Sequence, residues 1–148
     1  MTLPEPQFDD LYREVILDHY RRPRNRGSLA EATRTAEGVN PVCGDEVTLE
    51  LLINDHMIED VAFSGQGCAI SLASASMLTE RIKGKTTTEA ISVLGEVRAM
   101  LLDGEEPNPN LGDLEALEGV ARLPVRVKCA LLCWNVLQQG LNAPPNGA

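Results

Sequence analysis

Three cysteines and one aspartate are the residues of this chain whose types and positions could carry chemistry. Cys43 and Asp45 lie in NPVCGDEV, residues 40–47, a tight turn bracketed by Pro and Gly. Cys68 lies at the start of one expected helix, and Cys129 lies in the first turn or so of another. A helix start offers unpaired backbone N–H groups and a positive dipole end, which favour a thiolate over a thiol. We therefore expect these two cysteines to be prepared for metal binding or sulfur chemistry.

Together the four side chains would make a four-coordinate site of three thiolates and one carboxylate. Such a set suits Zn²⁺ or a labile iron–sulfur cluster. Structural zinc sites usually have only Cys and His ligands, often in paired CxxC motifs, whereas here the spacings are long and one ligand is a hard oxygen. The set therefore favours an exchangeable site. The spacing alone leaves open that these cysteines are small core residues.

The fourth cysteine is interpreted as a core residue. Cys133 shares a helix face with Ala130, Trp134 and Leu137. Its i, i+4 relation to Cys129 leaves a minor route by which it could approach the site.

One histidine and three serines are also interpreted as structural. His19 lies on the apolar side of the first helix, where a packing histidine with satisfied hydrogen bonds is expected rather than a ligand. The sequence places no histidine where it could activate Ser71, Ser74 or Ser76 as a nucleophile. Small residues at these positions would let their helix pack closely.

Periodicity predicts the elements that must position the site. Alternating apolar residues predict two strands joined by a tight reversal at NDHM, residues 54–57, and TTTE at 86–89 predicts a capping box. The stretch 28–42 has little periodicity and is expected to be loop with at most a short strand. The expected elements are helices at 8–21, 68–83, 86–103 and 125–139, strands at 47–54 and 58–64, and a helical piece near 113–118.

This order of elements predicts an α+β fold, with a small antiparallel β-sheet and helices packed on one of its faces. The length of 148 residues fits a single domain, 1–148, that can build a core without disulfides. Residues 1–7 and 141–148 are expected to be flexible tails.

Composition narrows the classes of partner. The net charge of −9 and the aromatic content of 3% argue against nucleic acid, because there is little to bind phosphates or stack bases. No apolar run approaches the roughly 20 residues of a membrane span, and residues 1–10 lack the features of a signal peptide. We therefore expect a cytoplasmic protein with reduced thiols.

Three motifs resemble, in order, the cysteine motifs of the IscU/SufU family of iron–sulfur cluster assembly proteins. They are NPVCGDEV at 40–47, SGQGCAISLASASML at 64–78 and PVRVKCALLCW at 124–134. The leading LYREVILDHYRRPRNRG is similar to the first helix of that family, so the resemblance covers residues 8–139. It implies a single domain of the NifU N-terminal type with a SufE/NifU/IscU-like fold.

Two departures from the scaffold-type members make the chain resemble the SufU branch. Lys128 stands where those members have a histidine before the third cysteine, and LPVRV at 123–127 only partly matches their chaperone-recognition stretch. The segment from 84 to 123 is also longer than in scaffold-type members.

The resemblance implies a zinc-dependent, sulfurtransferase-like persulfide acceptor. Its partners would be a SufS-type cysteine desulfurase, which is a pyridoxal-phosphate enzyme, and a downstream Suf cluster-assembly scaffold. Cys68 and Cys129 are built into helix ends, whereas Cys43 lies in a turn and can swing. We therefore expect Cys43 to accept the sulfur while Asp45 and the other two cysteines retain Zn²⁺.

Two other functions remain open at this stage. An IscU-type scaffold would assemble a transient [2Fe-2S] cluster, or bind iron, on the same ligands, and a zinc-stabilised interaction domain would have no sulfur chemistry. Arg126 and Lys128 flank Cys129 and could bind the desulfurase, although a solvated helix start explains them equally well.

Overall fold

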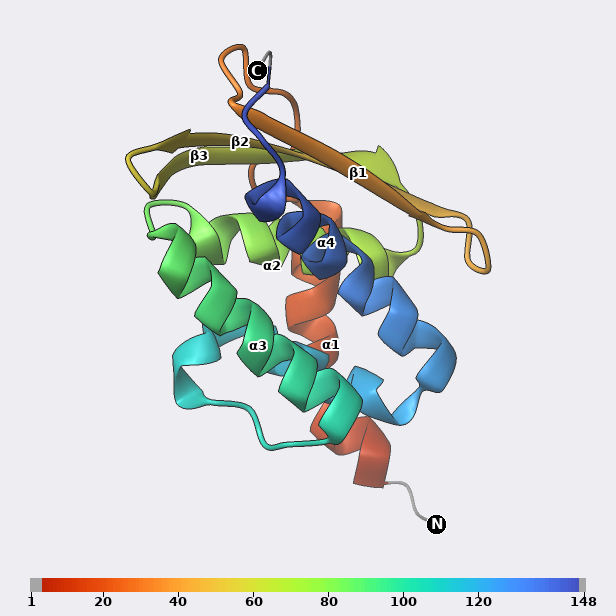
Figure 1. The fold of residues 1–148 in the computed structure, drawn as a ribbon. Helices are drawn as coiled ribbons and strands as arrows, with labels where there is room; N and C mark the ends of the chain where they lie inside the picture. The colour runs from red at the N-terminus through yellow and green to blue at the C-terminus, as the bar shows by residue number, and fades with distance from the viewer. Residues whose placement is uncertain (1–3, 147–148) are drawn as a thin grey trace.

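The computed structural model describes the backbone of residues 4–146 and the side chains of residues 12–146 (Figure 1). Its elements are α1 (Pro4–Arg21), β1 (Arg34–Asn40), β2 (Asp45–Asn54), β3 (Met57–Gln66), α2 (Ala69–Ile82), α3 (Thr87–Asp103), the 3-10 helix η1 (Pro109–Arg122) and α4 (Pro124–Asn142).

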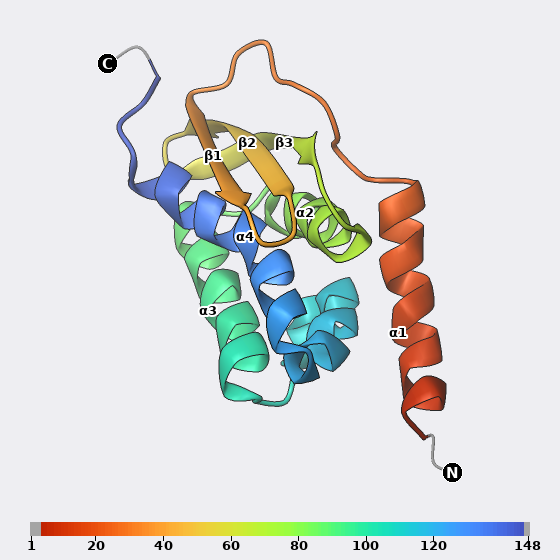
Figure 2. The same cartoon turned by 90° about the vertical axis from the view of Figure 1, so that its right-hand side faces the viewer.

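The three strands form one antiparallel sheet in the order β1-β2-β3. Helices gather on one face of the sheet: α2 and α4 pack against it directly, and α3, η1 and α1 pack on those helices (Figures 1 and 2). The predicted α+β fold with a helix-covered sheet face is confirmed. No helix within residues 4–146 has both the length and the apolar character needed to cross a membrane.

The predicted hairpin is present as β2 and β3. Val47, Leu49 and Leu51 on β2 are almost fully buried, and the residues between them are more exposed, as the alternation requires. Asp55 and His56 form the reversal with positive φ values of 53° and 65°. Two successive residues with positive φ are typical of the tight turns that match the twist of a hairpin.

The sequence predicts that residues 28–42 are mostly loop, with at most a short strand. In the structure, Arg34–Asn40 form the full strand β1. All seven residues from Arg34 to Asn40 pair with β2. The strand is not obvious in the sequence because small residues face the helices. A Cβ atom on Gly38 would lie 2.8 Å from Cγ2 of Val136 on α4, so the helix packs where an apolar side chain would otherwise be.

The helices agree with the prediction except at their ends. The capping box of α3 is confirmed: the backbone N–H of Thr86 donates to Oε1 of Glu89 at 2.8 Å, and that of Glu89 donates to Oγ1 of Thr86 at 3.1 Å. Helix α1 begins at Pro4 rather than at residue 8, since proline is tolerated in a first turn. The helical piece expected at 113–118 is extended to 109–122 as η1.

The segments expected to be flexible tails lie partly outside the described residues. Of the described part, Pro4 to Gln7 belong to α1, and the first two residues after 140 belong to α4. The backbone N–H of Asn146 donates to the carbonyl of Thr33 at 2.7 Å. The guanidinium of Arg34 donates to the carbonyl of Ala143 at 2.7 Å and to two earlier carbonyls at the end of α4.

Candidate metal centre

The turn between β1 and β2 positions Cys43 and Asp45. Asn40 and Asp45 are paired at the ends of the two strands, and the N–H of Cys43 donates to the carbonyl of Asn40 at 3.2 Å. Gly44 has a φ of 71°, which glycine adopts without strain. The turn ends beside α4, and this helix contributes Cys129 (Figure 2).

The structure brings three of the four predicted ligands close together. The sulfur atoms of Cys43 and Cys129 are 3.0 Å apart. One ligand atom from each of Cys43, Asp45 and Cys129 lies within 4.8 Å of the others. Cys129 and Asp45 have no exposed surface, whereas Cys43 is half-buried.

Cys68 borders this group from the start of α2. It is the N-cap residue, and its sulfur accepts the N–H of Ser71 at 3.4 Å, as expected for a cysteine at a helix start. Its own backbone N–H donates to Oδ1 of Asp45 at 2.9 Å. Cys68 therefore lies beside the carboxylate, although its sulfur is outside the 4.8 Å group.

The carboxylate of Asp45 is fully buried and only half satisfied. Its Oδ1 accepts the Cys68 N–H, but Oδ2 has no hydrogen-bond partner among the described residues. A buried carboxylate oxygen without a partner is costly, and a cation can remove that cost. A donor set of three sulfurs and one carboxylate oxygen fits Zn²⁺. The residues present therefore fit a metal ion.

A glycine lets the chain approach this carboxylate closely. A Cβ atom on Gly67 would lie 2.5 Å from Oδ1 of Asp45, closer than real Cβ atoms approach an oxygen. The GQG stretch before Cys68 thus positions the backbone N–H that contacts Asp45.

Cys129 differs from the sequence expectation. Helix α4 begins at Pro124, so Cys129 lies beyond the first turn and is not at the helix start. Burial raises the pKa of its thiol, and the hydrogen bond with the sulfur of Cys43 raises it further. The prediction that the helix start prepares this thiolate is therefore wrong. Metal binding must displace its proton.

Of the two flanking cations, only Arg126 is brought to the cysteines. A hydrogen bond with Cys129 and the charges of Cys68 and Cys129 raise the pKa of the Arg126 guanidinium. Lys128 is exposed on α4, and no hydrogen bond or ion pair joins its side chain to the cysteines among the described residues.

Sequence reasoning missed Asn40, the first residue of the NPVCGDEV stretch. Its side chain is 8% exposed, and its Nδ2 lies 3.8 Å from the sulfur of Cys129. Only its place in the motif signalled it, because asparagine is also common in turns.

Four exposed apolar residues lie near the ligands in the sequence. They are Val39, Val42, Leu123 and Val125, all of which are exposed. The first two flank the turn that bears Cys43, and the other two begin α4.

Cys133 is confirmed as a core residue. It has no exposed surface, and its sulfur lies 3.4 Å from Oγ of Ser74. Burial raises the pKa of Cys133 to about 12, so its thiol stays protonated.

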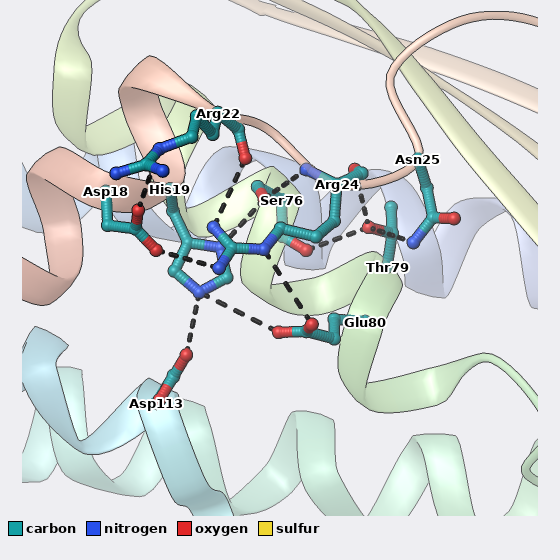
Figure 3. A network of polar contacts seen from close by, with 9 residues as sticks. All are labelled: Asp18, His19, Arg22, Arg24, Asn25, Ser76, Thr79, Glu80 and Asp113. Atoms are coloured by element: carbon teal, nitrogen blue, oxygen red, sulfur yellow. Dashed lines mark hydrogen bonds and ion pairs between the residues drawn. The ribbon is translucent and has the colours of Figure 1, made fainter.

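A second polar cluster centres on His19 (Figure 3). Its ring is fully buried, Nδ1 lies 2.8 Å from Oγ of Ser76, and Nε2 lies 2.8 Å from Oδ2 of Asp113. Glu80 is 3.8 Å from Nε2, and the Arg24 guanidinium is 3.8 Å from the other oxygen of Glu80. Both ring nitrogens have partners, so the prediction of a satisfied packing histidine is confirmed.

The same cluster corrects the prediction that no histidine serves the serines. His19 contacts Ser76 across 57 residues of sequence. The hydroxyl of Ser76 is fully buried and also accepts the backbone N–H of Arg24 at 2.8 Å. A hydroxyl so enclosed cannot meet a substrate, and it connects α1 to α2.

Residues 11–143 match the family model described as the NifU-like N terminal domain. The zinc-dependent sulfurtransferase SufU of Bacillus subtilis is 43% identical over 142 residues, which cover 95% of each chain. The iron–sulfur cluster assembly scaffold protein IscU of Streptococcus pyogenes is 38% identical over 143 residues, covering 95% of this chain and 88% of that protein.

Solved structures agree with these relatives. A crystal structure from Fervidobacterium islandicum, assigned as a scaffold protein for the SUF system, superposes with a TM-score of 0.82 and 40% identity. The superposition covers 87% of this chain and 95% of that one. The chain therefore belongs to the NifU-like N-terminal domain family, with the IscU and SufU proteins of iron–sulfur cluster assembly, as its three cysteine motifs predicted.

Proposed function

We propose that this protein accepts sulfur during iron–sulfur cluster assembly, taking it on Cys43 from the persulfide of a SufS-type cysteine desulfurase. The acceptor would bind Zn²⁺ and pass the sulfur to a downstream Suf scaffold in the cytoplasm. The proposed zinc ligands are Cys43, Asp45, Cys68 and Cys129.

The observation that carries this proposal is the unequal placement of the cysteines around a buried, half-satisfied carboxylate. Cys129 is fully enclosed in α4, and Cys68 is bound into the N-terminus of α2. Cys43 and Cys68 are both partly exposed, but of these two only Cys43 lies in a turn between strands rather than at a helix start. A sulfur acceptor needs one thiol that a partner can reach, and Cys43 meets that requirement. The similarity to a protein named as a zinc-dependent sulfurtransferase supports the same choice.

The transfer is a thiol–persulfide exchange that needs no outside oxidant or reductant. The thiolate of Cys43 attacks the outer sulfur of the desulfurase persulfide. A new S–S bond forms on Cys43 while the S–S bond on the desulfurase breaks, and the desulfurase cysteine leaves as a thiolate. When bound, Zn²⁺ would favour the thiolate form of its cysteine ligands. Arg126 would add positive charge beside the attacking thiolate.

The exposed apolar residues that lie near the ligands in the sequence would form the docking surface. Exposed valine and leucine side chains beside a reactive group are typical of protein interaction sites rather than of sites for small polar molecules. Arg126 follows Val125 directly in the sequence, and arginine is enriched at protein interfaces. We assign the desulfurase to it.

A scaffold function is the second candidate, because several similar proteins are named as IscU scaffolds. The same four side chains would then hold a transient [2Fe-2S] cluster, which thiolates also bind. Metal analysis of the purified protein separates the two functions. Colourless protein with one zinc supports the sulfur acceptor, and a brown, oxygen-sensitive protein with iron and sulfide supports the scaffold.

The proposal is tested by turnover of a cysteine desulfurase with and without this protein. Wild-type protein should stimulate turnover, and Cys43→Ala should abolish the stimulation. Cys133→Ala is the matched control, because its thiol is buried away from the site, and it should stimulate as wild type does. Normal stimulation by Cys43→Ala would overturn the assignment of Cys43 as the acceptor. It would then favour an interaction domain without sulfur chemistry.

A further inference from the structure

We propose that Asn40 is a positioning residue of the metal centre, whose side-chain amide donates a hydrogen bond to the thiolate of Cys129. This inference rests on the metal-binding part of the proposed function. It goes beyond that function because it assigns a role to a residue that supplies no ligand.

Asn40 contacts the site in three ways. It is the last residue of β1, where it pairs with Asp45 across the hairpin. Its carbonyl accepts the N–H of Cys43 and thereby closes the turn. Its Nδ2 lies 3.8 Å from Sγ of Cys129, a contact between residues that are 89 positions apart. One side chain and its backbone therefore link three of the proposed ligands.

The charge of the site explains why a donor is needed at this place. Three thiolates and a carboxylate carry more negative charge than one Zn²⁺ ion neutralises. Water can solvate the sulfurs of Cys43 and Cys68, which are partly exposed, and Cys68 also accepts the N–H of Ser71. Cys129 has no exposed surface, so protein groups rather than solvent must stabilise the negative charge that the metal leaves on its sulfur.

Apart from the other proposed ligands, few groups among the described residues face the sulfur of Cys129. The carbonyl of Val125, 3.8 Å away, is an acceptor and cannot stabilise a thiolate. The guanidinium of Arg126 faces it from an exposed position on α4 and is open to solvent screening. Asn40 is the buried, neutral donor among these groups, and a hydrogen bond from such a donor orients a ligand and lowers the negative charge on its sulfur.

The test compares Asn40→Leu and Asn40→Asp with Asn135→Leu. Leucine keeps the approximate size of the side chain without a donor, and aspartate keeps its shape while replacing the donor with a carboxylate. Asn135 is an exposed α4 residue whose side chain hydrogen-bonds only Arg98 among the described residues. Its variant is therefore the matched control. Zinc affinity is measured by competition with a chromophoric chelator. Cobalt(II) loading reports on the thiolates through their charge-transfer absorption.

We expect Asn40→Leu to weaken zinc binding by about 10- to 100-fold, the usual range for loss of a group that hydrogen-bonds a metal ligand. Asn40→Asp should weaken it further, and the control should bind as wild type does. The charge-transfer band of the cobalt(II) protein should move to longer wavelength in Asn40→Leu, because a thiolate without its hydrogen bond is a better electron donor. The metal-free variant should unfold at nearly the urea concentration of metal-free wild type.

Two outcomes would overturn the inference. One is zinc affinity within twofold of wild type for both Asn40 variants. The other is weakened binding with an unmoved charge-transfer band and an equal loss of stability in the metal-free protein, which would make Asn40 merely a turn residue. Failure of the metal-binding part of the proposed function gives a different result, because wild-type protein itself then shows no thiolate charge-transfer band with cobalt(II). Failure of sulfur transfer alone leaves the cobalt(II) band in place.

Discussion

The sulfur atoms of Cys43 and Cys129 lie 3.0 Å apart, although 86 residues separate them in the sequence. One belongs to a turn between strands and the other to the interior of a helix. This short distance defines the centre of the candidate site. It also means that oxidation of the two thiols can test the geometry of the site.

The first prediction concerns oxidation of this pair. In metal-free protein, diamide should take two electrons and two protons from the thiols of Cys43 and Cys129 and leave a disulfide between them. Peptide mass mapping checks the product. Zinc-loaded protein should resist, because its thiolates are bound. A dominant disulfide that includes Cys133 would contradict the structure, since that sulfur is buried beside Ser74.

The second prediction concerns the close approach of Gly67 to Asp45. Gly67→Ala should weaken zinc binding by at least about tenfold, because the new Cβ would displace the carboxylate from its position. Gly95→Ala is the matched control, since nothing lies within 4 Å of its added Cβ. That variant should bind zinc normally and gain roughly 0.5–1 kcal/mol of stability in its helix. Equal zinc affinity of the two variants would show that the contact does not matter.

The third prediction concerns the buried ring of His19. Asp113→Ala should lower the free energy of unfolding by about 1 kcal/mol, because it removes the acceptor at Nε2. The loss stays modest because the Asp113 side chain is 53% exposed and water can replace part of the contact. Urea unfolding measures the change, with Glu105→Ala as the exposed control. An unchanged midpoint for Asp113→Ala would show that the contact adds nothing to stability.

The fourth prediction concerns the pH dependence of the Asp18–Arg24 ion pair. The hydrogen bond from Arg24, at 2.7 Å, is the main reason that the pKa of Asp18 lies below its usual value of 3.8. A lowered pKa in the folded state means that the ionised carboxylate stabilises the fold above the unfolded pKa. That stability is lost as pH falls through the folded pKa.

Asp18→Asn should therefore be less stable than wild type at pH 7, and the difference should vanish in strong acid. Urea unfolding across this pH range checks the trend. A difference that stays constant down to pH values below the pKa would rule out an ionic origin.

The hairpin and the start of α3 could be predicted from sequence because their signals are local. Alternation in β2 reflects one buried and one exposed face, and the Thr86–Glu89 box needs only three residues of spacing. Strand β1 could not be predicted as securely, since Gly38 leaves its buried position without an apolar side chain.

The candidate site was predictable only as a set of residue types. Spacing identified Cys43, Asp45, Cys68 and Cys129 as candidates, and the motifs placed them in one family. The contact of Asn40 with Cys129 depends on how α4 packs on β1, which no local pattern encodes. The contact of His19 with Ser76 was also missed, because it depends on how α1 packs on α2, which no local pattern encodes.

The bonds from Arg34 to the end of α4 have a consequence for how the chain matures during synthesis. The carbonyls that Arg34 binds are made 106 to 109 residues after Arg34 itself. At the roughly 5–20 residues per second of translation, β1 waits several seconds for these partners. Until then α4 does not cover the face of β1 that carries Ala36, and exposed apolar surface of this kind is prone to aggregation. Arg34 therefore ties β1 to α4 only once the last turn of α4 has been made.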